Sequence, residues 1–194
     1  MSTARDTYHH GDLRTALIDA ALAMLEAGEP FSLRAVARRA EVSQTAPYRH
    51  FADREALESA LAVRGFQDLR RELSPTGALP ASEDELVEFA VAYVRFALRR
   101  PAVFRLMFGQ ECDDSNDARV IAAAELQSLV RDSVGAIYPD ADSDVLPQAV
   151  WALAHGLAFL HLDGKFSATS DDEVAARVRA AFLGIRALGQ AARV

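Results

Sequence analysis

The chain has 194 residues, of which 51% are hydrophobic and 25% are charged, a composition that excludes a largely disordered protein. Its formal net charge of −7 argues against a protein wrapped in nucleic acid, although cations clustered on one face could still bind DNA. The apolar runs fall short of the roughly 20 residues that span a bilayer, and the N-terminus lacks the apolar core of a signal peptide. The single cysteine, Cys112, excludes an intrachain disulfide. We therefore expect a cytoplasmic protein with no membrane partner.

Helical periodicity dominates the first third of the chain. A stripe of apolar residues at helical spacing predicts a first helix that ends at Gly28. Its members are Leu13, Leu17, Ala20, Ala21, Met24 and Leu25. We expect two short helices next, one from Ser32 to about Ala40 and one after Ser43. A longer helix is expected from Asp53 to about residue 73.

The rest of the chain also has a helical pattern. Residues 74–82 hold two prolines and a glycine, so they are expected to form a linker. A helix with apolar residues on most sides follows, which predicts a central position in a bundle. Pro101 interrupts it, and acidic loops at 111–117 and 139–144 precede the last helices. We predict an all-α fold of about nine helices. A three-helix module occupies residues 1–54 and continues into a linking helix at 53–73, and residues 74–194 form a larger helical bundle.

The two short helices have the spacing of a helix-turn-helix. Ser32 is a favourable N-cap for the first of them, and Ser43 is expected to cap the second after a turn of about three or four residues. In that motif the second helix enters the major groove of DNA with its first residues toward the base edges. Gln44 can pair with adenine, and Thr45 can bond a base or touch a thymine methyl group. The same spacing fits an ordinary helical hairpin.

The residues that follow suit a DNA backbone. Pro47 would lie at the fourth helical position, where its missing N–H costs little, and its ring would form a rigid apolar knob at the mouth of the groove. Tyr48, Arg49 and His50 can reach phosphates, which fixes the register without reading sequence. Phe51 is expected to anchor the segment to the core.

The sequence FSLRAVARRAEVSQTAPYRHFADREAL resembles the DNA-binding module of the TetR/AcrR family of one-component transcriptional regulators, and YHHGDLRTALIDAALAMLEAG resembles the first helix of that family. The resemblance covers about the first 60 residues. It implies an all-helical homodimer that binds double-stranded operator DNA and is most often a repressor released by a small molecule. It also implies DNA contacts from Ser32 and Arg34, from Gln44, Thr45, Tyr48 and His50, and from Arg54. A bacterial cytoplasmic, nucleoid-associated location follows.

One position departs from the family's pattern. The family usually places glycine in the turn where this chain has Glu41. If the backbone there is left-handed, a glutamate should cost on the order of 1 kcal/mol. Its negative charge would also weaken non-specific binding to DNA.

The C-terminal bundle carries a set of bulky residues that we expect to line an apolar ligand pocket. The set comprises Phe89, Tyr93, Phe96, Phe104, Met107, Phe108, Trp151, His155 and Phe159. Tyr93 and His155 would supply its polar groups, so the effector should be mostly apolar. The alternative is that these residues form only a packed core, with His155 hydrogen-bonded inside it. The segment around Trp151, His155 and Gly156 resembles a Trp-His-Gly subgroup of the family's regulatory domains.

The resemblance further implies that the last two helices form the dimer surface. The residues expected there are Leu157, Ala180, Ala181, Gly184, Ile185 and Leu188. A dimer also suits the function, since one short helix reads few bases and a two-fold pair reads a palindrome.

No catalytic, metal or cofactor site is expected. His155 and His161 are six residues apart and so lie on different faces of a helix. Acidic neighbours argue against a redox role for Cys112, and no phosphate-binding or metalloprotease motif occurs. The remaining alternative to a regulator is a helical dimeric interaction module, or a small-molecule-binding protein that does not bind operator DNA.

Overall fold

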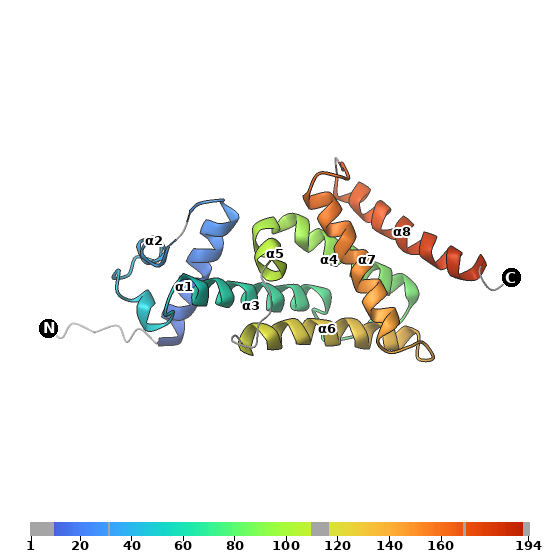
Figure 1. The fold of residues 1–194 in the computed structure, drawn as a ribbon, viewed down its shortest axis with the longest axis horizontal. Helices are drawn as coiled ribbons and strands as arrows, with labels where there is room; N and C mark the ends of the chain where they lie inside the picture. The colour runs from blue at the N-terminus through green and yellow to red at the C-terminus, as the bar shows by residue number, and fades with distance from the viewer. Residues whose placement is uncertain (1–9, 31, 110–116, 169, 192–194) are drawn as a thin grey trace.

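The computed structural model describes residues 10–30, 32–109, 117–168 and 170–191, and all the regular elements in these ranges are helical. The all-α prediction is therefore confirmed (Figure 1). The α-helices are α1 (His10–Glu26), α2 (Leu33–Arg39), α3 (Arg54–Leu73), α4 (Glu83–Arg99), α5 (Pro101–Phe108), α6 (Asp117–Ile137), α7 (Val145–Leu162) and α8 (Asp171–Ala191). The ninth element is a single 3-10 turn, η1 (Pro47–Arg49).

The N-terminal module consists of α1, α2, η1 and the first part of α3, and it lies at one end of the molecule (Figure 1). Leu17, Ala21, Val36 and Leu57 are fully buried and hold these elements together. The apolar stripe predicted for the first helix thus faces the core of the module.

Helix α3 runs from this module into the bundle. Asp53 caps it, because its Oδ1 accepts a hydrogen bond from the backbone N–H of Ala56 at 2.8 Å. Farther along, α3 packs closely on α5 at Gly65, where an added Cβ would lie 2.7 Å from the sulfur of Met107. A movement of α3 therefore involves both parts of the molecule.

The bundle is organised around α4, as the sequence predicted. Ser82 caps this helix through the N–H of Glu85, and Tyr93, Val94 and Phe96 are among its buried residues. Helices α7 and α8 both pack against α4, while α6 lies alongside α3 (Figure 1).

Helix α7 is more apolar than we expected. It has 18 residues with a mean hydropathy of 1.4, so by length and composition alone it could cross a membrane. The expectation that no stretch approaches that length is therefore wrong for α7. In the structure α7 packs against α4 and α6, as the core helix of a bundle does, yet only 28% of it is buried. Much of its apolar surface remains uncovered in a single chain.

Candidate nucleic-acid interface

The start of α2 has the predicted cap. Ser32 is extended, with φ −140° and ψ 162°, and its Oγ accepts a hydrogen bond from the N–H of Ala35 at 3.2 Å. Leu33, Val36 and Ala37 are buried beneath it, so the outer face of α2 is turned to solvent at Arg34. Ser32 and Arg34 are thus both exposed at the same helix end.

The turn after α2 depends on a left-handed residue. Glu41 has φ 56°, and it is the only residue other than glycine with a positive φ in the part of the chain that the structure describes. The N–H of Val42 donates to the carbonyl of Ala37 at 3.0 Å, and the N–H of Glu41 donates to that of Arg38 at 3.2 Å. This pair of bonds is a common helix ending in which glycine is preferred at the left-handed position. The backbone at Glu41 is therefore left-handed, which is the condition under which a glutamate there was expected to cost stability.

The second helix of the motif differs from the prediction. The backbone after Ser43 makes a turn, and the next helical element is η1. Its N-cap is Ala46 rather than Ser43, and Pro47 is its first residue. Ser43 Oγ lies 3.3 Å from Thr45 Oγ1 instead of capping a helix. Because Pro47 has no N–H, it cannot donate to the Ser43 carbonyl, and Ala46 makes the tighter three-residue bond to it at 2.9 Å. The prediction that Ser43 caps a second helix of the motif is therefore wrong.

The exposed face of this recognition segment, residues 43–50, carries the polar side chains. Ser43, Gln44, Thr45 and Arg49 are exposed, and the Tyr48 side chain is 51% exposed even though it is large and aromatic. An aromatic ring that ends in a hydroxyl and stands free of the core suits contact with a partner better than it suits packing. All five lie within residues 43–50, on either side of the buried Ala46 and Pro47.

Two of the predicted DNA-contacting residues, Pro47 and His50, are less exposed than the others. Pro47 is buried, so it supports the segment from below and is not the exposed knob that the sequence suggested. His50 is half-buried, and its Nε2 is buried without a hydrogen-bond partner among the described residues, which leaves it less available to a phosphate. Phe51 is 2% exposed and lies under the guanidinium of Arg14 at 5.4 Å, which confirms its role as the anchor.

Arg54 flanks the segment at the start of α3. Its Nε donates to Glu58 Oε1 at 2.7 Å, yet 63% of its side chain stays exposed. It lies one residue after the Asp53 cap, at the first position of α3.

An ion-pair bridge joins the module to the bundle, and the sequence analysis missed it. Arg100, between α4 and α5, donates to Glu26 at 2.6 Å on α1 and to Asp68 at 2.8 Å on α3. Arg64 also donates to Asp68, at 3.0 Å. Burial raises the pKa of Asp68, but the hydrogen bonds from Arg100 and Arg64 outweigh it, and the net pKa lies below the usual range. The partners are 32 and 74 residues apart, so no local pattern signals the bridge.

Family models match both parts of the chain. Residues 17–61 match "Bacterial regulatory proteins, tetR family", and residues 86–183 match "Tetracyclin repressor-like, C-terminal domain". The chain belongs to the TetR family. Its DNA-binding helix-turn-helix thus lies in the N-terminal module just described, and the protein is a transcriptional regulator. The Trp-His-Gly subgroup stays a prediction.

Individual proteins and solved structures resemble this chain over different lengths. An uncharacterised HTH-type transcriptional regulator of Haemophilus influenzae is 33% identical over 128 residues, which is 60% of this chain and 59% of that protein. A protein of unknown function from Rhodococcus sp. RHA1 has 31% identity and a TM-score of 0.77, over 93% of this chain and 98% of its own. A bacterial regulatory protein in the tetR family, also from Rhodococcus RHA1, shares the fold with a TM-score of 0.63 at 18% identity, over 88% and 95%.

Six of the nine predicted pocket residues, namely Tyr93, Phe104, Phe108, Trp151, His155 and Phe159, meet in this TetR-family bundle. The His155 ring lies 4.7 Å from that of Phe108 and 4.8 Å from that of Phe159, and Phe104 lies 5.6 Å from both His155 and Tyr93. Met107 is also buried, 1% exposed. Two residues of the set face elsewhere: Phe96 lies under Arg100 at 5.7 Å, and Phe89 lines a surface hollow beside Leu79.

A hydrogen-bonded chain runs through this aromatic cluster. Trp151 Nε1 donates to the Tyr93 hydroxyl at 3.2 Å, and that hydroxyl lies 2.8 Å from Nδ1 of His155. Burial raises the pKa of Tyr93 above its usual range and lowers the pKa of His155, so both stay neutral near pH 7. The Tyr93 O–H then donates to Nδ1, and Nε2 of His155 carries the proton. The edge of Trp151 reaches a hollow of about 210 Å³ on the surface.

The predicted dimer residues fall into two groups. Ala180, Gly184 and Ile185 are exposed on α8 and Ala181 is half-buried, whereas Leu157 is 6% exposed and packed inside its own chain. Leu160, one turn later on α7, is 39% exposed. The side chain of Leu188 is outside the described residues.

Within the described ranges no group of three or more His, Cys, Asp and Glu residues could hold a metal ion. Cys112 lies outside those ranges. The Nε2 of His161 lies 3.4 Å from Arg177 Nη1, a cation that would oppose binding of a metal there.

Proposed function

We propose that this TetR-family regulator is a repressor that binds palindromic operator DNA as a homodimer and leaves it when a small apolar effector binds. The observation that carries the proposal is the exposed face of the recognition segment. It presents Gln44, Thr45 and Tyr48 together, on a module anchored by Phe51.

The side chains divide by the contact that each can make. Gln44 and Thr45, near the start of the recognition segment, would read base edges, since an amide pairs with adenine and a threonine methyl packs on thymine. Ser32, Arg34, Tyr48, Arg49 and Arg54 would hold phosphates, with Ser43 beside them. Pro47 would support the segment from below, and His50 would contribute only if its ring moves outward. The backbone contacts set affinity and the base contacts set specificity.

A second copy of the chain would cover the outer face of α7 and α8. Leu160, Leu183 and Ile185 are 39%, 47% and 54% exposed, which is unusual for three large apolar side chains on neighbouring helices. Ala180 and Gly184 on the same side are small enough for close helix contact. Because the face is rich in apolar residues and a palindrome needs two readers, a two-fold dimer is the partner that fits.

The effector would act through α3. An apolar molecule that enters at Trp151 and separates Tyr93 from His155 would shift α4 and α5, which contact α3 directly and through Arg100. The two recognition segments need a separation of about 34–36 Å for half-sites one helical turn apart. An effector that binds the DNA-free arrangement more tightly would release the operator.

Fluorescence anisotropy tests the proposal. Wild-type protein is titrated with duplex from upstream of its own gene and with a scrambled duplex, over a salt series. Binding to one duplex that weakens steeply with salt is expected. Tyr48→Ala should lose that binding with unchanged helicity and oligomeric state. Equal binding of Tyr48→Ala and wild type would refute the assignment of the interface and favour a helical module that does not read DNA.

A further inference from the structure

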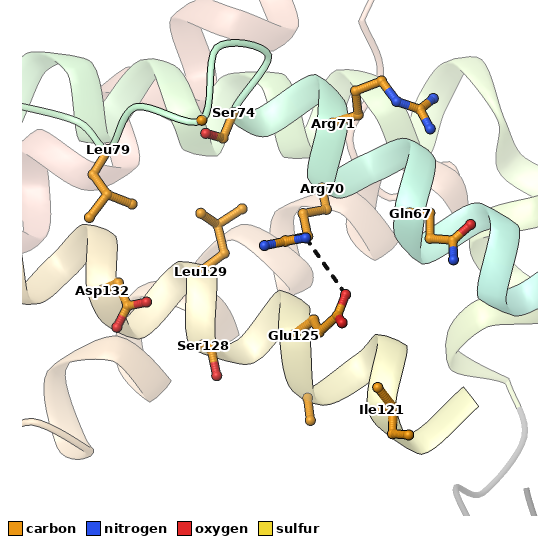
Figure 2. A pocket seen from close by; sticks show the side chains of 12 residues that line it. Gln67, Arg70, Arg71, Ser74, Leu79, Ile121, Glu125, Ser128, Leu129 and Asp132 are labelled. Carbon is orange, nitrogen blue, oxygen red and sulfur yellow. Dashed lines mark ion pairs between the residues drawn. The ribbon is translucent and has the colours of Figure 1, made fainter. Parts of the chain in front are cut away.

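A larger hollow lies away from the aromatic cluster, between α3 and α6 (Figure 2). It encloses about 930 Å³, within the range of small-molecule sites, and is open on one side. The walls are α3 and α6, and the segment 74–79 closes one end. Nothing in the sequence signalled this groove, because its walls are about 50 residues apart along the chain.

The charges of the groove are separated along its length. Arg70 lies near the middle of one wall, and its Nη1 is 3.7 Å from Glu125 Oε2, too far for a hydrogen bond. Its side chain is 54% exposed, so its N–H donors remain open to a ligand. Asp132 lies two turns farther along α6, and its carboxylate has no ion pair or hydrogen bond to any residue that the structure describes.

Between these charges the groove is apolar. Leu129 lies on α6 between Glu125 and Asp132, and Leu79 faces it from the segment 74–79 (Figure 2). Asp132 follows Glu125 by seven positions, a rise of about 10 Å along α6 at 1.5 Å per residue. The groove thus offers a cation beside Glu125 and an unpaired carboxylate two turns farther along α6, with leucines between them.

We propose that this groove binds an elongated zwitterion with an apolar middle, its carboxylate on Arg70 and its ammonium group on Asp132. A molecule with only one charge would leave the other end of the groove unmatched. The charges that face the ligand also include Arg71, which is already bonded to Asp68 at 3.0 Å, and Glu125, which stays on the far side of Arg70. Gln67, Ser74 and Ser128 supply further hydrogen-bonding groups.

The groove is placed to influence DNA binding. Arg70 belongs to the same helix, α3, that begins at the recognition module, and Asp68 of the interdomain bridge is two residues earlier. A ligand that ties α3 to α6 would therefore favour one position of α3. Binding in the groove does not depend on the proposed function, whereas its effect on operator affinity rests on it.

Calorimetric titration of the full chain with 8-aminooctanoate, octanoate and octylamine tests the charge pattern. The amino acid should bind roughly tenfold or more tightly than either singly charged compound, since each end makes a charge-assisted bond. Asp132→Asn should weaken 8-aminooctanoate and octylamine but leave octanoate unchanged. Arg70→Gln should weaken 8-aminooctanoate and octanoate but leave octylamine unchanged.

Matched controls lie away from both hollows. Arg39 is 50% exposed and 3.6 Å from Glu29, almost the same setting as Arg70, but it lies on α2 and outside the groove. Arg39→Gln and Asp140→Asn should bind all three compounds as wild type does. Absence of saturable binding, or equal losses in groove and control variants, overturns the proposal.

The regulatory part has its own readout. Saturating 8-aminooctanoate should change operator affinity in the anisotropy assay, and Asp132→Asn should abolish that change. Binding without a change in operator affinity refutes the regulatory role. If the wild type binds no operator at all, the proposed function fails, and the calorimetry still decides whether the groove is a binding site.

Discussion

Glu41→Gly is expected to stabilise the protein. The chain ends three helices with the same pair of backbone bonds, at Gly28, Glu41 and Gly164, whose φ angles are 67°, 56° and 66°. Only the second of these positions carries a side chain. A left-handed backbone costs an L-residue about 1–2 kcal/mol. Glu41 therefore lowers the free energy of unfolding by a strain that the two glycines do not have.

The net gain is smaller than this strain. Glycine restores flexibility to the unfolded chain, which takes back about 0.5–1 kcal/mol. The free energy of unfolding should therefore rise by about 0.5–1 kcal/mol, and the Tm should rise by about 1–4 °C for a chain of this size.

The assay is thermal and urea unfolding of three variants followed by circular dichroism. Glu41→Gln removes the charge but keeps the strained backbone, so its stability should stay near wild type. Gly164→Ala introduces the same strain where the added Cβ would contact nothing within 4 Å, and it should be destabilised by an amount similar to the gain in Glu41→Gly. A Tm of Glu41→Gly at or below that of Glu41→Gln would refute the reasoning.

The same variants separate strain from charge in DNA binding. Glu41→Gln and Glu41→Gly both remove a negative charge beside the recognition segment, so both should bind a scrambled duplex more tightly than wild type at low salt. The gain should disappear as salt screens the charge. A gain only in Glu41→Gly would show that turn geometry, and not charge, limits affinity.

Three further predictions follow from the bundle. Tyr93→Phe should lower the free energy of unfolding by about 1–3 kcal/mol in urea melts, because Trp151 Nε1 and His155 Nδ1 both lose their partner; an unchanged midpoint would contradict the hydrogen-bonded chain. Burial lowers the folded-state pKa of His155, so its contribution to stability should be complete above about pH 6.5 and lost as the pH falls through that lowered value. Urea melts at about pH 7.5 and about pH 5.5 measure this loss, and His155→Gln should reduce the difference; an equal pH dependence in the variant would assign it to other groups. Ile185→Glu places a charge on the exposed α8 face and should convert the proposed dimer to monomer in analytical ultracentrifugation with helicity unchanged, whereas a variant that stays dimeric would place the interface elsewhere.

The single-copy structure also explains why α7 resembles a membrane span. Its apolar residues face α4 on one side, and on the other they face the surface that we assign to a second copy. A helix covered on both sides in the proposed dimer would need apolar residues all round. Burial between subunits would therefore account for the same composition.

The sequence by itself determined most helix boundaries and the family, because these depend on interactions between residues that are close along the chain. The Ser32 cap, the linker at 74–82 and the boundaries of α3 and α7 follow from residues a few positions apart, which act through local hydrogen bonds and helical periodicity. The left-handed Glu41 could also be anticipated, because the family that the sequence resembles usually places glycine at that position. Local interactions keep their geometry in any fold, so they can be read in advance.

Tertiary structure decided what depends on distant partners. The burial of Pro47 follows from how the recognition segment packs onto the module, where Phe51 anchors it. Leu157 and Leu160 have the same side chain, and only the packing of α7 on α4 buries one and exposes the other. The Tyr93–His155 bond, the Arg100 bridge and the α3–α6 groove join residues tens of positions apart. Their geometry depends on how helices cross, which is set by the sum of all side-chain contacts and not by any local pattern.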